Sequence, residues 1–440
     1  MPSKVLPKVS FFEVLKNAGS ILKNPLPFHH RNFEKHGDVF KVSLGFGKSV
    51  LFVRDAGLAK HMLQKQHKIY HKSPLQSKEL ARYVGEGLLT ANGEKWLRQR
   101  RLIQPAFHKK KLEKLLSTME MVIDKELKRI TTDTEIDVFP LMSDLAFKVV
   151  AMSLFSYKGD DKVIRRLQDI TEKAQKTLIK EIRQPYKRWW FYLNGTVRRA
   201  LSETKEARDL LFQIIEERRA SQQRYDDLLD MLLESRYDDG SAMDNEQLID
   251  EILILFTAGH ETTSNALSFG LLLLAQHPDQ QQHLFDELQQ QKSADLLDEM
   301  KNSEYTTYSI EETMRLYPPA YFSDRVAIED DIYNDLEIKK GTTLLISFFE
   351  IHRNSRNWEN PETFSPERFK KDAKEYSDYY FPFGAGPRMC IGSNFAMYEM
   401  IMVVNRLVSK YKLNTKIENI EIKPLITLKP KSSYIHFTKR

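Results

Sequence analysis

The pattern of apolar and polar positions along the chain predicts a mainly helical protein with small β regions. Apolar residues recur at helical spacing in a series of segments, namely 25–36, 55–65, 94–103, 110–130, 138–156, 163–182, 195–223, 244–277, 305–316 and 391–407. Strand-like runs are short, at 39–44 and 49–53 around a Gly-Phe-Gly turn and again at 320–326. Residues 85–90, between the helical segments, contain two glycines and are expected to form a loop.

Composition agrees with this pattern. The chain has only 17 glycines in 440 residues, below the average of ~7%. No segment rich in proline, glycine or serine divides it, so we expect a single domain over residues 1–440, with 1–24 as an N-terminal segment. The net charge is +6, and the longest basic run, at 108–111, opens a predicted helix. Ordinary solubility is therefore favoured over nucleic acid binding.

The N-terminus carries no sign of a membrane anchor. Residues 9–15 are apolar only briefly and are interrupted by Glu13, whereas a spanning helix needs ~20 apolar residues. A small-residue cleavage site is also missing. We therefore expect a soluble, cytoplasmic protein that binds no membrane and is a monomer.

The long helix predicted at 244–277 has an unusual centre. Gly259 and the polar residues that follow it interrupt an otherwise apolar helix, and a glycine there costs about 1 kcal/mol relative to alanine. A solvent-facing polar patch is one interpretation, but the flanking residues are apolar nearly all round the helix. Glu261 beside Thr262 then places a carboxylate next to a hydroxyl in the protein interior, an arrangement suited to proton delivery.

The only cysteine, Cys390, ends a glycine-punctuated loop. A single cysteine cannot form an internal disulfide, so it must serve in packing, reactivity or metal ligation. Glycines at 384, 386 and 392 allow sharp turns and leave peptide N–H groups available to stabilise a thiolate. The helix predicted from 391 adds a positive helix end. A buried inert cysteine is the alternative, but the pattern Phe-x-x-Gly-x-Arg-x-Cys-x-Gly favours metal ligation.

At residues 383–392 the chain resembles the cytochromes P450, in which a cysteine thiolate in such a loop holds a haem iron. Companion motifs occur in the same order as in that family, namely Trp96-x-x-x-Arg100, Ala258-Gly259-His260-Glu261-Thr262-Thr263, Glu312-x-x-Arg315 and Pro366-Glu367-Arg368-Phe369. The resemblance covers residues 25–440. It implies the P450 fold, with haem b between the long central helix and the cysteine-loop helix.

The resemblance also implies roles for individual residues. Cys390 is expected to ligate the iron, and the other haem contacts are expected at Trp96, Arg100, Arg325, Phe383, Gly384, Arg388 and Gly392. Glu261 and Thr262 would be catalytic. The substrate pocket would be lined by Leu89, Ala258, Gly259, Ala320, Tyr321 and Phe322. Glu312, Arg315 and Arg368 would form a charged triad that shapes the scaffold.

Three functions fit a haem-thiolate site: a monooxygenase, a peroxygenase that uses H2O2, and a non-catalytic haem sensor. The acid and alcohol at Glu261 and Thr262 favour the first, because a monooxygenase must deliver protons as dioxygen is split. The resemblance implies a stand-alone, bacterial-type enzyme that receives electrons from a ferredoxin or flavodoxin and its reductase. Fatty acids, terpenoids and methylated sugars fit as small-molecule substrates, by hydroxylation or O-demethylation. The pair Trp189-Trp190 is expected to anchor neighbouring helices, or else to stack on a sugar ring.

Overall fold

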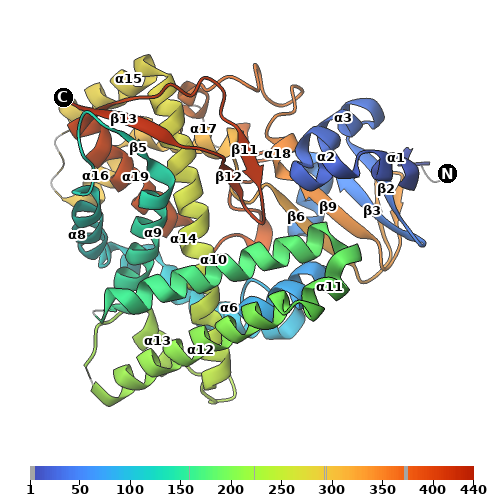
Figure 1. Cartoon of the computed structure of the whole chain (residues 1–440), viewed down its shortest axis with the longest axis horizontal. Helices are drawn as coiled ribbons and strands as arrows, with labels where there is room; N and C mark the ends of the chain where they lie inside the picture. Colours follow the sequence, from blue (N-terminus) through green and yellow to red (C-terminus); the bar gives the residue numbers. More distant parts are fainter. Residues whose placement is uncertain (1–4, 158, 222, 292, 294, 371–374) are drawn as a thin grey trace. The chain divides into compact units, whose positions relative to one another are not determined.

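The computed structural model describes residues 5–157, 159–221, 223–291, 293, 295–370 and 375–440. The chain divides into two compact units. Unit 1 comprises Met1–Ser73, Glu311–Cys390 and Ile422–Lys429, and unit 2 comprises Pro74–Ile310, Ile391–Glu421 and Pro430–Arg440 (Figure 1). Helices dominate and the sheets are small, as the sequence pattern predicted.

Unit 1 is built on a six-stranded mixed sheet. Its strands, in spatial order, are β1 (Lys8–Val9), β2 (Val39–Gly45), β3 (Lys48–Val53), β9 (Thr343–Ser347), β6 (Phe322–Ala327) and β4 (Tyr70–His71). The predicted hairpin is confirmed, since β2 and β3 pair antiparallel around Phe46 and Gly47. Val9 of β1 is fully buried, so the N-terminal segment adds a strand to the sheet. That strand was not predicted.

The other elements of unit 1 are short helices, turns and strands outside this sheet. They are α1 (Phe11–Lys16), α2 (Ala18–Lys23), α3 (Leu26–His36), α4 (Ala56–Lys60), the π-helix η1 (His61–Lys65), β7 (Asp331–Tyr333), β8 (Leu336–Ile338), α18 (Phe348–Ile351), the 3-10 turns η5 (Pro366–Lys370) and η7 (Gly386–Arg388), and β11 (Ile422–Pro424). The helix α3 ends at Gly37, whose φ of 85° provides the left-handed turn. The strand β12 (Leu428–Pro430) pairs with β11.

Unit 2 contains most of the helices. They are the π-helix η2 (Leu75–Leu80), α5 (Ala81–Val84), α6 (Gly93–Ile103), η3 (Gln104–Phe107), α7 (Lys109–Glu113), α8 (Leu116–Leu127), α9 (Val138–Phe155), α10 (Asp161–Arg183), η4 (Pro185–Lys187), α11 (Arg188–Leu193), α12 (Thr196–Ser221), α13 (Leu228–Glu234), α14 (Asn245–Gln276), α15 (Pro278–Gln290), α16 (Leu296–Asn302) and α19 (Ser393–Lys410). A small sheet orders β10 (Tyr411–Asn414), β13 (Tyr434–Lys439) and β5 (Glu135–Asp137). The helix α17 (Glu304–Leu316) continues from unit 2 into unit 1.

The helix α14 is the longest of the described helices and packs along α9, while α10 and α12 run side by side (Figure 1). Only α9, among the helices that the structure describes, is long and apolar enough to cross a membrane, and 72% of its residues are buried within the protein. Burial of that extent is typical of a core helix. Phe147 of α9 stacks on Phe256 of α14, which fixes these two helices against each other.

Two of the predicted helices are interrupted. The segment 110–130 divides into α7 and α8, because the amides of Lys114 and Leu115 bond three residues back, to Lys111 and Leu112, instead of four. The segment 55–65 begins as α4 and widens into the π-helix η1. Neither change has a proline or glycine signal in the sequence.

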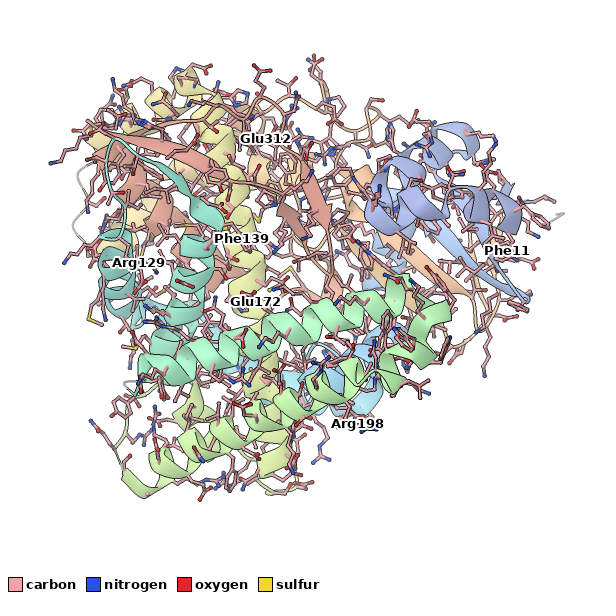
Figure 2. All side chains as sticks on the ribbon, in the orientation of Figure 1. Phe11, Arg129, Phe139, Glu172, Arg198 and Glu312 are labelled. Atoms are coloured by element: carbon pink, nitrogen blue, oxygen red, sulfur yellow. The ribbon has the colours of Figure 1, made fainter. Side chains whose placement is uncertain are left out.

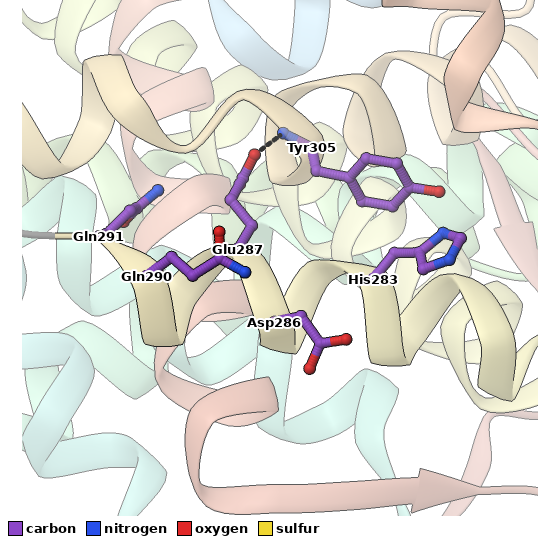
Figure 3. Close-up of a pocket in the computed structure, with 6 residues that line it drawn as sticks. All are labelled: His283, Asp286, Glu287, Gln290, Gln291 and Tyr305. Atoms are coloured by element: carbon purple, nitrogen blue, oxygen red, sulfur yellow. Dashed lines mark hydrogen bonds between the residues drawn. The ribbon is translucent and has the colours of Figure 1, made fainter.

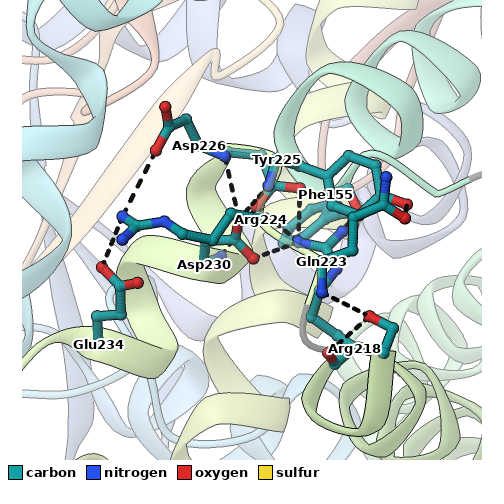
Figure 4. Close-up of polar contacts among 10 residues, drawn as sticks. Phe155, Arg218, Gln223, Arg224, Tyr225, Asp226, Asp230 and Glu234 are labelled. Atoms are coloured by element: carbon teal, nitrogen blue, oxygen red, sulfur yellow. Dashed lines mark hydrogen bonds and ion pairs between the residues drawn. The ribbon is translucent and has the colours of Figure 1, made fainter.

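A buried ion-pair cluster joins the end of α12 to α13. Nη1 of Arg218 donates to the carboxylates of Asp227, at 2.9 Å, and Asp230, at 2.6 Å (Figure 4). Nη2 donates to the carbonyl oxygen of Phe155, at the end of α9. Burial raises the pKa of Asp227, while Arg218 acts in the opposite direction. These contacts fix three helix ends with one side chain.

Candidate active site

The loop that carries Cys390 is held by its own backbone. The amide of Cys390 donates to the carbonyl oxygen of Phe383 at 2.9 Å, and the amide of Met389 donates to Gly386 at 2.9 Å. Phe381 and Ala385, on either side of the turn, are buried in the core of unit 1. Cys390 itself is exposed and is not part of a disulfide. The loop therefore presents the thiol outward from a fixed backbone instead of packing it in the core.

The glycines of this loop serve different needs. Gly384 and Gly386 both have a left-handed backbone, with φ of 72° and 70°. A Cβ at Gly386 would overlap the carbonyl oxygen of Leu63, in the π-helix η1, whereas a Cβ at Gly384 would meet open space. Only Gly386 is thus required for a close approach between two backbone segments. The sequence did not predict that η1 supports the loop.

Substituting these glycines separates the two effects. We expect Gly384→Ala to lower the free energy of unfolding by about 1–2 kcal/mol, the cost of a left-handed residue with a Cβ. Gly386→Ala should lower it by clearly more, because the added methyl also collides with backbone. Chemical denaturation of the two variants measures the difference. Equal losses would show that the contact with Leu63 does not constrain the loop.

A cluster of three cations lies in unit 1, in which Arg325 is buried and Lys72 and Arg388 are half-buried. Arg325 is 6% exposed, and burial lowers its pKa to about 10. Burial and the charge of Arg325 lower the pKa of Arg388 to about 9. Burial, followed by these two guanidinium groups, also lowers the pKa of Lys72. The charge of the Asp324 carboxylate acts in the opposite direction and raises the pKa of both Lys72 and Arg325. Three interacting cations, two of which also interact with Asp324, make a site suited to an anionic ligand.

Lys72 is a site residue that the sequence analysis missed. The strands β4 and β6 pair antiparallel, with Tyr70 opposite Ala327 and His71 opposite Val326. Continuing that register places Lys72 opposite Arg325. No local pattern around residue 72 signals this position, because it depends on pairing between segments more than 250 residues apart.

The three residues of the predicted charged triad are hydrogen-bonded to one another in unit 1. Arg315 is fully buried and binds Glu312, labelled in Figure 2, through Nε at 2.7 Å and Nη2 at 2.9 Å. Nε of Arg368 donates to the same carboxylate at 3.1 Å. Arg315 also donates to the carbonyl oxygens of His352 and Pro361. The triad ties α17 to the segments around 352–368.

The motif at the centre of α14 separates into two faces. Thr257, His260 and Thr263 are buried, and His260 packs against Phe147 of α9. Ala258, Gly259, Glu261 and Thr262 are half-buried and form the more open strip. The hydroxyl of Thr262 donates to the carbonyl oxygen of Ala258 at 2.8 Å. The acid and alcohol that were predicted to be catalytic thus share one accessible face of the helix.

The remaining predicted site residues are distributed over both units. Trp96, 7% exposed, and Arg100 lie in α6 of unit 2, where Nε of Arg100 donates to Gln104. Unit 2 also holds Leu89, which is half-buried in the loop after α5. Ala320, Tyr321 and Phe322 belong to unit 1.

Two expectations need correction. Tyr321 was expected to line the substrate pocket, but it is 4% exposed and its hydroxyl donates to the carbonyl oxygen of Leu425, so it is committed to the core of unit 1. Trp189 and Trp190 were expected to anchor helices, but they are 63% and 50% exposed. Phe191, between them and Tyr192, is the buried residue of α11.

A surface pocket of about 440 Å³ lies on α15, where His283 and Glu287 face Tyr305 (Figure 3). The amide of Tyr305 donates to Glu287 at 2.8 Å. No residue of the predicted motifs lines this pocket. It is therefore separate from the candidate active site.

Comparison with known proteins supports the interpretation of the Cys390 loop as a haem-binding site. Residues 5–437 match the family model described as Cytochrome P450. The chain is 31% identical over 397 residues to a cytokinin hydroxylase from Arabidopsis thaliana, covering 87% of this chain and 77% of that protein. It is 29% identical over 413 residues to the Arabidopsis thaliana protein LUTEIN DEFICIENT 5, chloroplastic (86% and 68%). It is also 29% identical over 387 residues to Cytochrome P450 4A10 of Mus musculus (82% and 76%).

A helical fold with an exposed cysteine on a fixed loop and a cluster of cations fits a haem-thiolate protein. The chain belongs to the cytochrome P450 family. It is accordingly a haem-binding monooxygenase. The expectations of a bacterial-type protein, a single haem domain, a monomer and a cytoplasmic location stay predictions.

The residues present fit haem. The exposed thiol of Cys390 can ligate iron, and the cations Lys72, Arg325 and Arg388 suit the two propionate groups of the cofactor. The pKa directions of these cations support the same conclusion, since an anion beside them would raise the pKa values that burial and mutual repulsion lower.

Proposed function

We propose that the enzyme inserts one oxygen atom of O2 into a C–H bond of a small organic substrate, by hydroxylation or oxidative O-demethylation. The observation that carries this proposal is that Glu261 and Thr262 are neighbours on the open strip of α14. Haem held by Cys390 supplies the oxygen chemistry when bound. The name of one relative, a cytokinin hydroxylase, supports the reaction type.

Thr262 and Glu261 are proposed to move protons. Oγ1 of Thr262 donates its own proton to Ala258, so its lone pairs remain to accept a hydrogen bond on the open side of the helix. Breaking the bond to Ala258 lets the same hydroxyl donate outward. Glu261, one residue earlier on the same strip, is a carboxyl group that can replace a proton passed on by Thr262.

Thr262→Ala is expected to uncouple the reaction. Reductant should still be consumed, but more of the oxygen should leave as hydrogen peroxide, because the alcohol that passes protons is gone. Product formed per reductant consumed should fall about tenfold or more. The measurement is parallel quantification of reductant, peroxide and product.

Thr263→Ala is the matched control. Thr263 makes the same bond four residues back, to Gly259 at 3.0 Å, but it is buried on the other face. Its variant should keep normal coupling. If both variants couple as well as the parent enzyme, Thr262 only shapes the helix. Faster turnover with hydrogen peroxide than with reductant and ferredoxin would instead favour a peroxygenase.

The substrate is proposed to be a small lipophile, such as a fatty acid or terpenoid, or a methylated sugar. The support is the apolar character of Leu89, Ala258 and Phe322, three of the residues that the family resemblance assigns to substrate binding. Exposed Trp189 and Trp190 leave a sugar substrate in consideration, because indole rings stack on sugars. A compound panel screened for a shift of the haem absorption band tests these classes against one another.

Electrons are proposed to come from a separate ferredoxin or flavodoxin with its reductase. The support is that cytochromes P450 need a redox partner, and that a net charge of +6 suits an acidic one. Charges exposed to solvent are screened over about 8 Å at physiological ionic strength. The second-order rate of reduction by an acidic ferredoxin should therefore fall steeply with added salt in stopped-flow measurements.

A ferredoxin variant with neutralised acidic residues is the control and should lose most of this salt dependence. A rate that is indifferent to salt with the native ferredoxin would reject electrostatic docking. Efficient turnover with NAD(P)H alone would reject the separate donor.

A further inference from the structure

We propose that Asp250 and Glu251 are positioning residues that hold the loop 85–91 against α14 and thereby control entry of bulky molecules to the substrate pocket. This inference rests on the proposed function for the existence of that pocket beside Leu89. Both carboxylates, the loop and the neighbouring helix α12 belong to unit 2.

Glu251 is the buried half of this contact. It is fully buried, and Oε2 accepts the amide proton of Leu88 at 3.0 Å. Oε1 accepts from the side chain of Gln247 at 3.0 Å. Burial raises the pKa of Glu251 to about 8, so near neutral pH the group is largely protonated. The buried carboxyl group of Glu251 therefore binds an amide of the loop.

Asp250 extends the contact to a second helix. One oxygen accepts the amide proton of Glu86 at 2.7 Å. The other pairs with Nη1 of Arg208, in α12. Arg208 also pairs with Glu246, one turn earlier on α14. Asp250 therefore connects the loop, α14 and α12 through a single side chain.

The glycines of the loop make this approach possible. Gly85 has a φ of 83°, and a Cβ there would overlap the carboxylate of Asp250. A Cβ at Gly87 would lie 2.6 Å from Oε2 of Glu251. Any larger residue at either position would push the loop away from α14. The two glycines that marked this segment as a loop in the sequence are thus fitted to the two carboxylates.

The loop is also held by hydrogen bonds within it and by side chains of α14 and α6. Oγ1 of Thr90 donates to the carbonyl oxygen of Gly85 at 2.7 Å and accepts the amide proton of Gly87 at 3.2 Å. The carbonyl oxygen of Glu86 accepts from Gln247 at 3.1 Å and from Gln99 at 3.2 Å. Side chains of α14 and α6 hold the loop from outside, so releasing them frees it as one piece with Leu89 on it.

Hydrogen exchange of the haem-loaded protein tests the contact directly. In Glu251→Ala the amide of Leu88 should exchange about tenfold faster, as expected for the loss of one buried hydrogen bond. Glu251→Gln should stay close to the parent, because the amide oxygen can still accept from Leu88. Asp250→Ala should accelerate the amide of Glu86 in the same way.

Glu246→Ala is the control, because Glu246 also binds Arg208 but its side chain is 81% exposed, and among the described residues the carboxylates that accept the amides of Glu86 and Leu88 are those of Asp250 and Glu251. In the Glu246→Ala variant the amides of Glu86 and Leu88 should exchange at the same rate as in the parent protein. Unchanged exchange in both Glu251→Ala and Asp250→Ala would overturn the proposal. If Glu251→Ala does not fold, Asp250→Ala decides.

Access is tested with two probes of different size, imidazole and 1-phenylimidazole, mixed with the haem-loaded protein in stopped flow. Glu251→Ala should raise the association rate of phenylimidazole severalfold more than that of imidazole. Glu251→Gln should keep both association rates close to those of the parent protein. Faster amide exchange with an unchanged ratio of the two rates would overturn the role in access. A parent protein whose haem band responds to neither probe would count against the proposed function instead.

Discussion

Replacing Cys390 by histidine is expected to abolish monooxygenase activity and the thiolate-type spectrum of the ferrous CO complex. The chain has one cysteine, so no other thiolate can take its place. Cys390 is exposed on a loop fixed by the bond from its own amide to Phe383, so the sulfur is presented for ligation and does not pack in the core. Histidine can retain iron at best, but it supplies no thiolate charge.

The measurement is the absorption spectrum of the reduced, CO-treated protein together with its haem content. Met389→Leu is the matched control, because Met389 is the preceding exposed side chain of the same loop. That variant should keep the parent spectrum. A thiolate-type spectrum that persists in Cys390→His would show that the iron ligand has been assigned wrongly.

Glu312→Gln is expected to lower the free energy of unfolding by about 3–5 kcal/mol, the effect of leaving a buried charge without its partner. Arg315 is fully buried, and both of its contacts with Glu312 would then lack the opposing charge. Arg368 loses the same carboxylate. The substitution keeps the volume of the side chain, so a cavity does not explain the loss.

Denaturant titration measures this change, and Glu216→Gln provides the comparison. Glu216 pairs with Arg219 at the same three-residue helical spacing, but both side chains are largely exposed, at 47% and 40%. Glu216→Gln should therefore lower the free energy of unfolding by only about 0–1 kcal/mol. Similar losses in the two variants would mean that burial of Glu312 and Arg315 does not make their pairing important.

Features that depend on local sequence were predictable. The long helix 244–277, the hairpin around Phe46 and the end of α3 at Gly37 follow from periodicity and turn residues, and the structure has them within one or two positions. The triad of Glu312, Arg315 and Arg368 required the family resemblance, since a Glu and an Arg three residues apart are common on any helix.

Features that depend on pairing between distant segments were not predictable. The π-helix η1 carries no local signal, yet its Leu63 carbonyl is what requires glycine at 386. Lys72 reads as an ordinary polar residue until β4 pairs with β6. Trp189 and Trp190 were misjudged for the opposite reason, because aromatic character suggested burial while the short helix α11 turns only Phe191 inward.

Because α11 is exposed, the tryptophan fluorescence of the protein comes from two groups of side chains, one open to solvent and one buried. Of its four tryptophans, Trp96 and Trp358 are 7% and 4% exposed, while Trp189 and Trp190 are open to solvent. A quencher dissolved in water, such as acrylamide, should therefore suppress the emission of the second pair and leave that of the first. Fluorescence recorded with and without quencher would then follow events at α11 separately from loss of the folded core, with no label attached.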